Sequence, residues 1–300
     1  MTSTEPTWRA ISEPDLPSLV ALTKRVLAED GGLPVAGDEP FLRRRYLDGV
    51  IASTAAFMDA DLVAAAAVRP VGDGTIAASV GRIAAGVGMV DPVWRERGLG
   101  GHLLDWALTQ AGDVPVRMET ESLTPAADAL MRDRGLRQTF AEDVMRFDLV
   151  QEPPAVHPPA DVMLIEWSSE LGNRFFGVYE AAFRERPGFP GWSAGQWIEW
   201  ISDDEDFAPE WTLLATREGT DLGFVASARG AWIVQVGTTA AARGTSIGAA
   251  LTAEALRRMR AGGETEALLD VNVDNPGAIR VYERLGFAHI GRRARYERVT

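Results

Sequence analysis

One tyrosine near the C-terminal end of the chain lies in the most informative segment of the sequence. The segment DNPGAIRVYERLGF, residues 274–287, follows an apolar run and places Asn275, Ala278 and Tyr282 at near-helical spacing. Asn-Pro is typical of a helix start, and Gly286 ends the helix one turn after Tyr282. A tyrosine one turn before a helix-ending glycine is ordinary by itself, although a phenol can donate a proton. The same tyrosine could instead be a core aromatic with its hydroxyl at the surface.

A glycine-containing loop in the first half of the chain predicts an anion site. In GMVDPVWRERGLGG, residues 88–101, a strand and an Asp-Pro step lead into a helix. Glycine lets the backbone approach an anion closely, and the free N–H groups of the first helical turn bind phosphate. The candidate binding residues are Met89, Val90, Arg95, Arg97, Gly98, Leu99, Gly100 and Gly101.

The second half repeats this loop in VGTTAAARGTSIGAAL, residues 236–251, with Arg243, Ser246 and Gly248 in the places of Arg95, Gly98 and Gly100. Serine cannot replace glycine freely where φ is positive, so we expect weakened phosphate binding, or a helix start whose ligand site has decayed. The candidate binding residues are Val236, Gly237, Thr238, Arg243, Gly244, Ser246, Ile247, Gly248 and Ala249, with Asn275 from the final helix.

The two halves share one order of predicted elements. A proline-rich segment, QEPPAVHPPAD, reads as a linker at 151–161, between domains at 1–150 and 162–300. We predict an α/β fold of two tandem domains, each a mixed central sheet with helices on both faces. The expected elements of the first half are 8–11, 15–28, 41–47, 55–58, 62–68, 82–90, 98–110, 114–119, 126–134 and 144–149. Those of the second are 162–166, 173–183, 196–201, 211–216, 222–228, 232–236, 247–260, 267–273, 276–285 and 288–296.

Only the second half carries the tyrosine. Aligning the final helices at Gly135 and Gly286 sets Met131 opposite Tyr282 and Thr124 opposite Asn275. Methionine has no ionisable proton, so we expect binding without chemistry in the first domain and chemistry in the second. Because the first loop keeps Gly98, we expect it to bind its ligand at least as readily as the second.

These motifs resemble the tandem GNAT N-acetyltransferases, and the layout is most similar to the mycothiol synthase subgroup, including DFAPEWTLLA at 206–215. The resemblance implies acetyl-CoA as co-substrate in the C-terminal domain and a second, structural acetyl-CoA in the N-terminal domain. It also implies that Tyr282 protonates the departing CoA thiolate, and that the acceptor is a primary amine of a small molecule, a glucosamine amine in that subgroup.

One position departs from the family. Its general-base glutamate lies on the strand before the loop, where this chain has Trp232, and indole cannot accept a proton. The carboxylates that could replace it are Asp270, Glu199, Asp203 and Asp204. Two alternatives stay open. One is a different acyltransferase, either an aminoglycoside-type or other antibiotic N-acetyltransferase or one that acts on protein amines. The other is a non-catalytic acyl-CoA-binding or regulatory protein. Aromatic residues at 192–211 could line an acceptor pocket or form a core.

Composition excludes several other classes. A net charge of −13 argues against nucleic-acid and anionic-membrane partners. The absence of cysteine excludes disulfides and thiolate chemistry, and three histidines far apart predict no metal site. The chain has no apolar run long enough for a membrane span and no signal-peptide pattern at MTSTEPTW, so we expect a cytoplasmic protein. The oligomeric state is not readable from these patterns.

Overall fold

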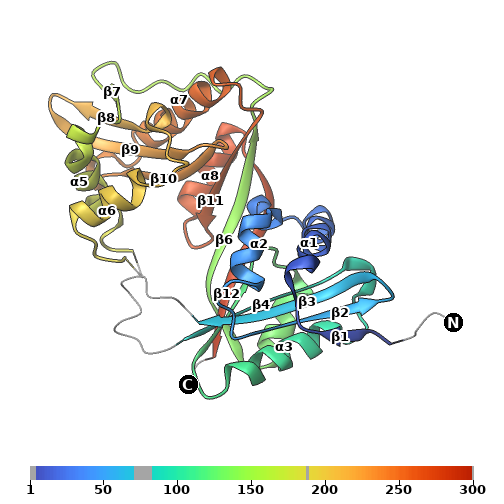
Figure 1. Ribbon diagram of the computed structural model, residues 1–300. Helices are drawn as coiled ribbons and strands as arrows, with labels where there is room; N and C mark the ends of the chain where they lie inside the picture. The colour runs from blue at the N-terminus through green and yellow to red at the C-terminus, as the bar shows by residue number, and fades with distance from the viewer. Residues whose placement is uncertain (1–4, 71–82, 187–188, 299–300) are drawn as a thin grey trace. The chain divides into compact units, whose positions relative to one another are not determined.

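The computed structural model describes residues 5–70, 83–186 and 189–298, and they form two compact units. Unit 1 comprises Met1–Val144 and Ile290–Thr300, and unit 2 comprises Met145–His289. Each unit combines a mixed sheet with helices (Figure 1), which confirms the predicted α/β class.

Unit 1 contains the strand order β1-β2-β3-β4-β5-β12-β6. Helices α1 and α2 pack on one face around a core that includes Leu19, Leu22 and Leu42, while Leu99 and Leu103 of α3 pack on the other. The strands are β1 (Thr7–Arg9), β2 (Ala52–Met58), β3 (Asp61–Pro70), β4 (Ala84–Val90), β5 (Val116–Thr120), β6 (Leu136–Asp148) and β12 (Ala288–Arg298). The helices are α1 (Leu16–Asp30), α2 (Glu39–Tyr46), α3 (Leu99–Ala111) and α4 (Pro125–Asp133).

Unit 2 repeats the plan, in the order β11-β10-β9-β8-β7 with the end of β6 beside β11. One face carries an aromatic core of α5 and α6 around Trp197 and Phe224; the other carries the α7 and α8 core around Leu251 and Leu269. The strands are β7 (Met163–Glu166), β8 (Leu213–Arg217), β9 (Thr220–Ala228), β10 (Trp232–Thr238) and β11 (Glu266–Asn272). The helices are α5 (Gly172–Phe183), α6 (Ala194–Ser202), α7 (Ile247–Ala261) and α8 (Pro276–Leu285).

Each expected helix and strand has a counterpart, usually shifted by a few residues at its ends. The largest shift is in β6, which begins at Leu136 rather than at 144 because it starts directly after the helix-ending Gly135. Arg82, the first residue of the expected strand 82–90, lies outside the described residues.

The closing strands do not follow the expected boundaries at 150 and 162. The end of β6 belongs to unit 2, where Phe147 and Leu149 join the core that contains Phe287. Most of β12 belongs to unit 1, where Ala294 and Tyr296 pair with Thr120 and Met118 of β5. Each half of the sequence therefore supplies a strand to the unit built mainly by the other half.

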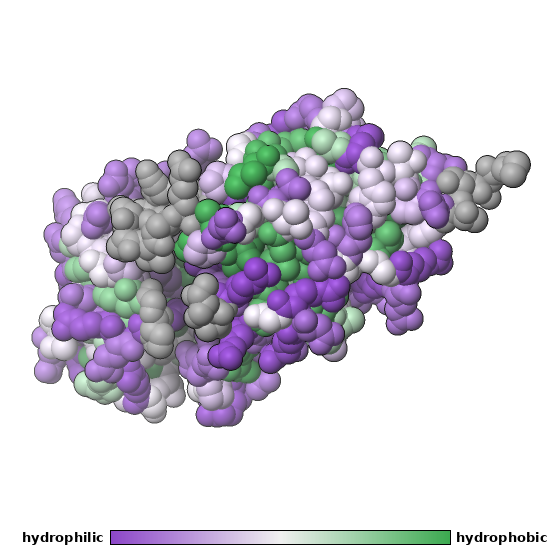
Figure 2. Space-filling view, turned by 90° about the horizontal axis from the view of Figure 1, so that it is seen from below, coloured by the Kyte–Doolittle hydropathy of each residue, from purple (hydrophilic) through white to green (hydrophobic). Residues whose placement is uncertain are grey.

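The face of the molecule in Figure 2 is mainly hydrophilic, with smaller hydrophobic areas among the hydrophilic side chains. Within the described residues, no helix is both long and apolar enough to cross a membrane.

Candidate functional site

In each unit, two neighbouring parallel strands separate at corresponding places: β4 from β5 in unit 1, and β10 from β11 in unit 2. In unit 1, parallel pairing joins Ala84–Val87 of β4 to Val116–Glu119 of β5, whereas β4 continues to Val90. In unit 2, Trp232 and Ile233 of β10 pair with β11, whereas β10 continues to Thr238. Beyond these points the backbone groups that face the neighbouring strand are open to a ligand, since β10 keeps its antiparallel pairing with β9 on the other side only.

The loops that follow β4 and β10 share a backbone conformation. Gly98 has φ 82° and Ser246 has φ 64°, both left-handed, and both residues are the N-caps of long helices. A second left-handed position lies two residues earlier, at Glu96 (φ 61°) and Gly244 (φ 76°). Each loop thus has one glycine and one larger residue at its two left-handed positions. Ser246 keeps the loop shape at a conformational cost of about 1–2 kcal/mol.

The charges beside the two loops differ. Arg95 is held by Asp30 through two bonds, Nη1–Oδ1 at 2.7 Å and Nη2–Oδ2 at 2.5 Å, and Arg97 lies over the Trp94 ring at 4.5 Å. The Arg243 side chain is exposed and forms no hydrogen bond or ion pair within the described part of the chain, although its backbone N–H donates to the carbonyl oxygen of Ala240. Arg243 is therefore available to an anion, whereas much of the Arg95 charge is already neutralised. Arg243 favours phosphate binding in unit 2, whereas glycine content favours unit 1, where exposed Arg97 also lies beside the loop, so the expected order of affinity stays a prediction.

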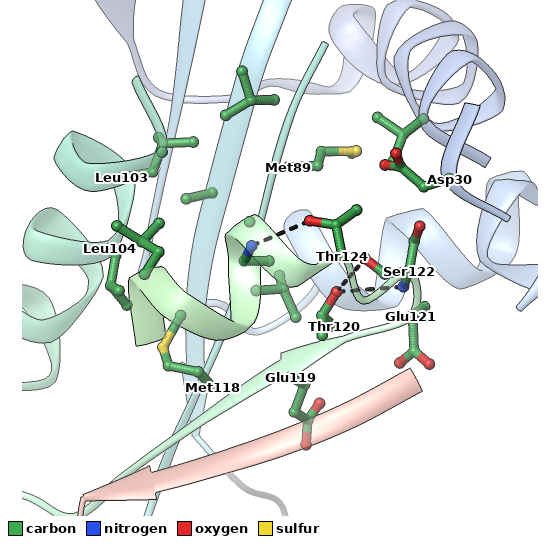
Figure 3. Close-up of a pocket in the computed structure, with 18 of the residues that line it drawn as sticks. Asp30, Met89, Leu103, Leu104, Met118, Glu119, Thr120, Glu121, Ser122 and Thr124 are labelled. Carbon is green, nitrogen blue, oxygen red and sulfur yellow. Dashed lines mark hydrogen bonds between the residues drawn. The ribbon is translucent and has the colours of Figure 1, made fainter. Parts of the chain in front are cut away.

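Unit 1 holds a cavity of about 440 Å³ that runs from its loop to the space beneath α1 and α2. Gly98, Gly100 and Gly101 line one part of it, and Val26 and Leu42 line another. Figure 3 shows Leu103, Leu104 and Met118 on its walls, with the carboxylates of Glu119 and Glu121 lying beside β12. The predicted residues Met89, Val90 and Arg95 also line this cavity.

Tyr282 lies on α8, in the core on the α7 face of unit 2, with its ring 5.8 Å from that of Phe287. The residue is 9% exposed, and burial raises the pKa of its hydroxyl to about 12. That hydroxyl forms no hydrogen bond among the described residues, yet it is not one of the buried polar atoms that lack a partner, so it keeps contact with solvent. Met131, its counterpart in unit 1, lines the cavity.

The sequence comparisons extend these geometric findings. The Acetyltransferase (GNAT) family profile matches residues 167–287. A mycothiol acetyltransferase of Thermobispora bispora is 32% identical over 66% of this chain and 70% of its own length, and one of Nocardioides sp. is 30% identical over 67% and 75%. The chain belongs to the GNAT acetyltransferase family.

Solved GNAT structures share the fold over nearly the whole chain. A GCN5-related N-acetyltransferase from Sphaerobacter thermophilus has a TM-score of 0.74 at 24% identity, covering 99% of this chain and 96% of that one. A tandem GNAT protein from the clavulanic acid biosynthesis pathway has a TM-score of 0.60 at 16% identity, covering 98% of each. The predicted tandem GNAT fold is thereby confirmed. The family match and the sequence relatives, rather than these structures, show that this GNAT protein is an acetyltransferase that acts on an amine.

Asn275, a predicted binding residue, caps α8 in this GNAT protein. Its Oδ1 accepts a hydrogen bond from the N–H of Ala278 at 3.2 Å, and Thr124 caps α4 in the same way through Ala127 N–H at 3.1 Å. Both caps satisfy a free N–H of the first turn. The structure therefore gives Asn275 a role in starting the helix that carries Tyr282.

Polar side chains lie on the α5 and α6 face of unit 2, on the strands β10 and β11 that separate there. Leu269 and Val271 belong to the core on the α7 face, so side-chain alternation turns Asp270 toward the α5 and α6 face. Gln235 lies on that face, where its Oε1 accepts a hydrogen bond from Trp197 Nε1 at 3.3 Å. Trp232 precedes Ile233 of the α7-face core, so it too points toward α5 and α6.

Most of the aromatic residues at 192–211 are core. Trp197 is fully buried and stacks on Tyr179, and Trp211 is buried in the other core of unit 2. Trp192 and Trp200 form a more accessible pair, 5.2 Å apart, with Trp200 46% exposed.

Sequence reasoning missed Glu96 and the ion pairs around the unit 1 cavity. Glu96 has an ordinary residue type for a loop, and only the backbone reveals its left-handed conformation. Asp30, Arg45 and Glu119 come from segments far apart in the sequence, so their convergence depends on the sheet. The spacing of Glu96 and Gly98 against Gly244 and Ser246 is the signal that could have indicated two equivalent positions.

Proposed function

We propose that unit 2 transfers the acetyl group of acetyl-CoA to a primary amine of a small molecule, by direct attack in a ternary complex. The observation that carries this proposal is the position of Tyr282, a solvent-touching phenol on a capped helix of the unit whose phosphate loop has an uncommitted arginine. Zero cysteines leave no thiol for a covalent acyl-enzyme.

The loop after β10 suits acetyl-CoA. Left-handed Gly244 and Ser246 open the turn, and the free N–H groups of α7 from Ile247 onward point toward a bound pyrophosphate, with Arg243 beside it. The unpaired edge of Val236–Thr238 supplies backbone N–H groups that can polarise a thioester carbonyl.

The neutral amine attacks the thioester carbonyl carbon, forming the amide C–N bond while the C–S bond breaks. Tyr282 gives its phenolic proton to the leaving sulfur, and the attacking nitrogen loses a proton to a base. A pKa of about 12 keeps Tyr282 protonated at neutral pH, which is the state a general acid requires.

Asp270 is the carboxylate best placed to be that base. It follows Leu269, the last residue of β11 that pairs with β10, and it points to the α5 and α6 face. Glu199 and Asp203 are exposed on and after α6, and the Asp204 carboxylate accepts the N–H of Asp206 at 2.9 Å. Asp270 thus replaces, on the adjacent strand, the carboxylate that Trp232 displaces.

Unit 1 is proposed to bind a second acyl-CoA without turning it over. Its cavity joins the loop to the space under α1 and α2, and Met131 stands where unit 2 has Tyr282. Such a ligand would stabilise unit 1 by mass action when its free concentration exceeds its Kd.

The test is an acceptor screen of amino sugars, other small amines and peptides with acetyl-CoA, followed by variants against the best acceptor. Tyr282→Phe should lower kcat by about 100-fold with little change in the KM for acetyl-CoA. Asp270→Asn should also lower kcat, mainly below the pKa of the amine, where a base is needed to remove its proton. An unchanged kcat for Tyr282→Phe would remove the tyrosine from the mechanism, and peptides as the best acceptors would overturn the small-molecule assignment.

A further inference from the structure

The cavity of unit 1 contains an apolar chamber on the α1 and α2 side of its sheet. The chamber is continuous with the phosphate loop, because the same cavity is lined by Gly98 and Gly100. The chamber is lined by Val26, Leu27, Ala36, Leu42, Tyr46 and Val87. Most of these side chains are buried in the core of unit 1, so the chamber has fixed apolar walls.

The polar groups at its margin are already engaged within the protein. Glu119 Oε2 accepts hydrogen bonds from Arg45 and, at 2.8 Å, from Arg69, and Glu121 Oε1 accepts one from Arg45 at 3.0 Å. Burial opposes ionisation of Glu119, but Arg45 and Arg69 together hold its pKa below the usual value. Carboxylates neutralised in this way are poor partners for the ammonium group of an amine acceptor.

Two other polar side chains are likewise occupied. Thr23 Oγ1 donates to the carbonyl oxygen of Leu19 at 2.9 Å, and Asp30 is bound to Arg95. Tyr46 is buried, and desolvation raises the pKa of its hydroxyl, so it stays neutral. The chamber therefore offers apolar contact and few unused polar groups.

Unit 1 also lacks the groups that would consume an acyl donor. Met131 replaces the acid, and aligning Arg95 with Arg243 sets Ala84 opposite Trp232, the position of the family's base. A thioester held here would stay intact, and the space used for an acceptor in unit 2 would be free for the acyl chain.

We infer that unit 1 retains an acyl-CoA whose straight apolar acyl chain is longer than acetyl and occupies the chamber beneath α1 and α2. The inference rests on the proposed acyl-CoA site of unit 1 and adds the chemical class of the acyl group. The ligand is held by its phosphates at α3 and by its chain beneath Val26 and Leu42.

Titration calorimetry on the full-length Gly248→Trp variant, which blocks the loop of unit 2, tests this inference with acetyl-CoA and hexanoyl-CoA as probes. Four additional buried methylenes should lower the Kd for hexanoyl-CoA by at least about 10-fold relative to acetyl-CoA. Equal affinities would overturn the longer-chain inference alone, whereas absence of binding by either probe would overturn it together with the acyl-CoA site of unit 1. Neither result bears on turnover by unit 2.

Chamber variants in the same background give a second readout. Ala36 is buried at the chamber wall, and Ala36→Phe should remove the hexanoyl preference while the Kd for acetyl-CoA stays within about twofold. Ala28→Phe adds the same ring on the exposed face of α1 and should keep the preference. Val26→Ala enlarges the chamber and should move the preference toward octanoyl-CoA. A hexanoyl preference that survives Ala36→Phe with an unchanged melting temperature would place the chain elsewhere and contradict the inference.

Discussion

Ser246 and Glu96 carry the conformational strain of the two phosphate loops. Both are non-glycine residues with positive φ, and the equivalent residues in the opposite loop, Gly98 and Gly244, are glycines with open space around them. A side chain in the left-handed region costs about 1–2 kcal/mol. Replacing it with glycine removes this cost, but glycine also raises the entropy of the unfolded chain, which offsets part of the gain in stability.

Ser246→Gly should therefore raise the free energy of unfolding by about 0.5–1 kcal/mol, and Glu96→Gly by a similar amount. Glu96→Gly should also tighten acyl-CoA binding in unit 1, because it removes a carboxylate beside the phosphate site. Denaturant unfolding measures the free energy of unfolding of both variants, and titration calorimetry measures the acyl-CoA binding of Glu96→Gly. Ser246→Ala is the matched control, since alanine keeps the strain; an equal gain from alanine would show that strain is not the cause.

The raised pKa of Tyr282 makes a prediction about pH. A general acid works only while protonated, and an acid with a pKa of about 12 stays protonated well beyond pH 10. We expect kcat at saturating substrates to show no alkaline decline between about pH 8 and pH 10.5. If the general acid had the ordinary tyrosine pKa, kcat would fall to half its maximum near pH 10. A decline centred near pH 10 that Tyr282→Phe abolishes would contradict burial of the acid.

At the scale of elements, the closing strands separate what the sequence could predict from what it could not. Periodicity located β6 and β12, and glycine stops located α4 and α8, because those signals are local. The partner of each strand is a long-range property. β12 follows α8 directly, yet its Arg293 lies 3.3 Å from Glu121 and its Arg292 lies 2.6 Å from Asp143, both in unit 1.

The residues of the candidate site also divide into those that local sequence patterns predict and those that depend on long-range contacts. Asn275 and Thr124 fall at equivalent caps, as their spacing from Gly286 and Gly135 predicted. The pairing of Arg95 with Asp30, by contrast, joins the end of α1 to the loop after β4, and no short-range pattern encodes it.

Because most of β12 belongs to unit 1 and the end of β6 belongs to unit 2, a substitution in either strand should destabilise the unit built mainly by the other half of the sequence. Tyr296 is fully buried in unit 1, where its hydroxyl donates to Asp128 at 2.6 Å and accepts from Gln138 at 2.9 Å. Tyr296→Phe should destabilise unit 1 by about 1–2 kcal/mol, although the residue is near the C-terminus. Phe147→Ala, on the strand that closes the first half, should instead destabilise unit 2 by about 3–5 kcal/mol.

Hydrogen exchange resolved by segment measures both effects. Tyr296→Phe should speed exchange in β5 more than in β10, and Phe147→Ala should do the opposite. If each substitution instead destabilised the unit formed by its own half of the sequence, the assignment of β12 to unit 1 and of the end of β6 to unit 2 would be wrong.

At the scale of the whole molecule, the two units share one order of elements and differ in the groups that they supply for binding and for chemistry. Unit 1 has an open cavity and Met131 in place of an acid, while Unit 2 has Tyr282, Asp270 and a loop arginine without an ion-pair partner among the described residues. The central claim is that chemistry belongs to unit 2 and that unit 1 binds without turnover.

Matched blocks of the two loops test this claim. Gly100 and Gly248 are equivalent first-turn glycines without left-handed φ, and a Cβ at either meets its nearest neighbour at an ordinary distance, 3.4 Å from Leu130 or 3.5 Å from Thr238. Tryptophan at each position therefore blocks one loop without forcing the backbone.

The deciding measurement is steady-state release of CoA from acetyl-CoA, with the best amine acceptor, by the Gly100→Trp and Gly248→Trp proteins. We predict that Gly248→Trp lowers kcat/KM by at least about 100-fold, while Gly100→Trp keeps it within about threefold of the unmodified protein. Loss of turnover in Gly100→Trp with retention in Gly248→Trp would contradict the account, because the chemistry would then belong to unit 1.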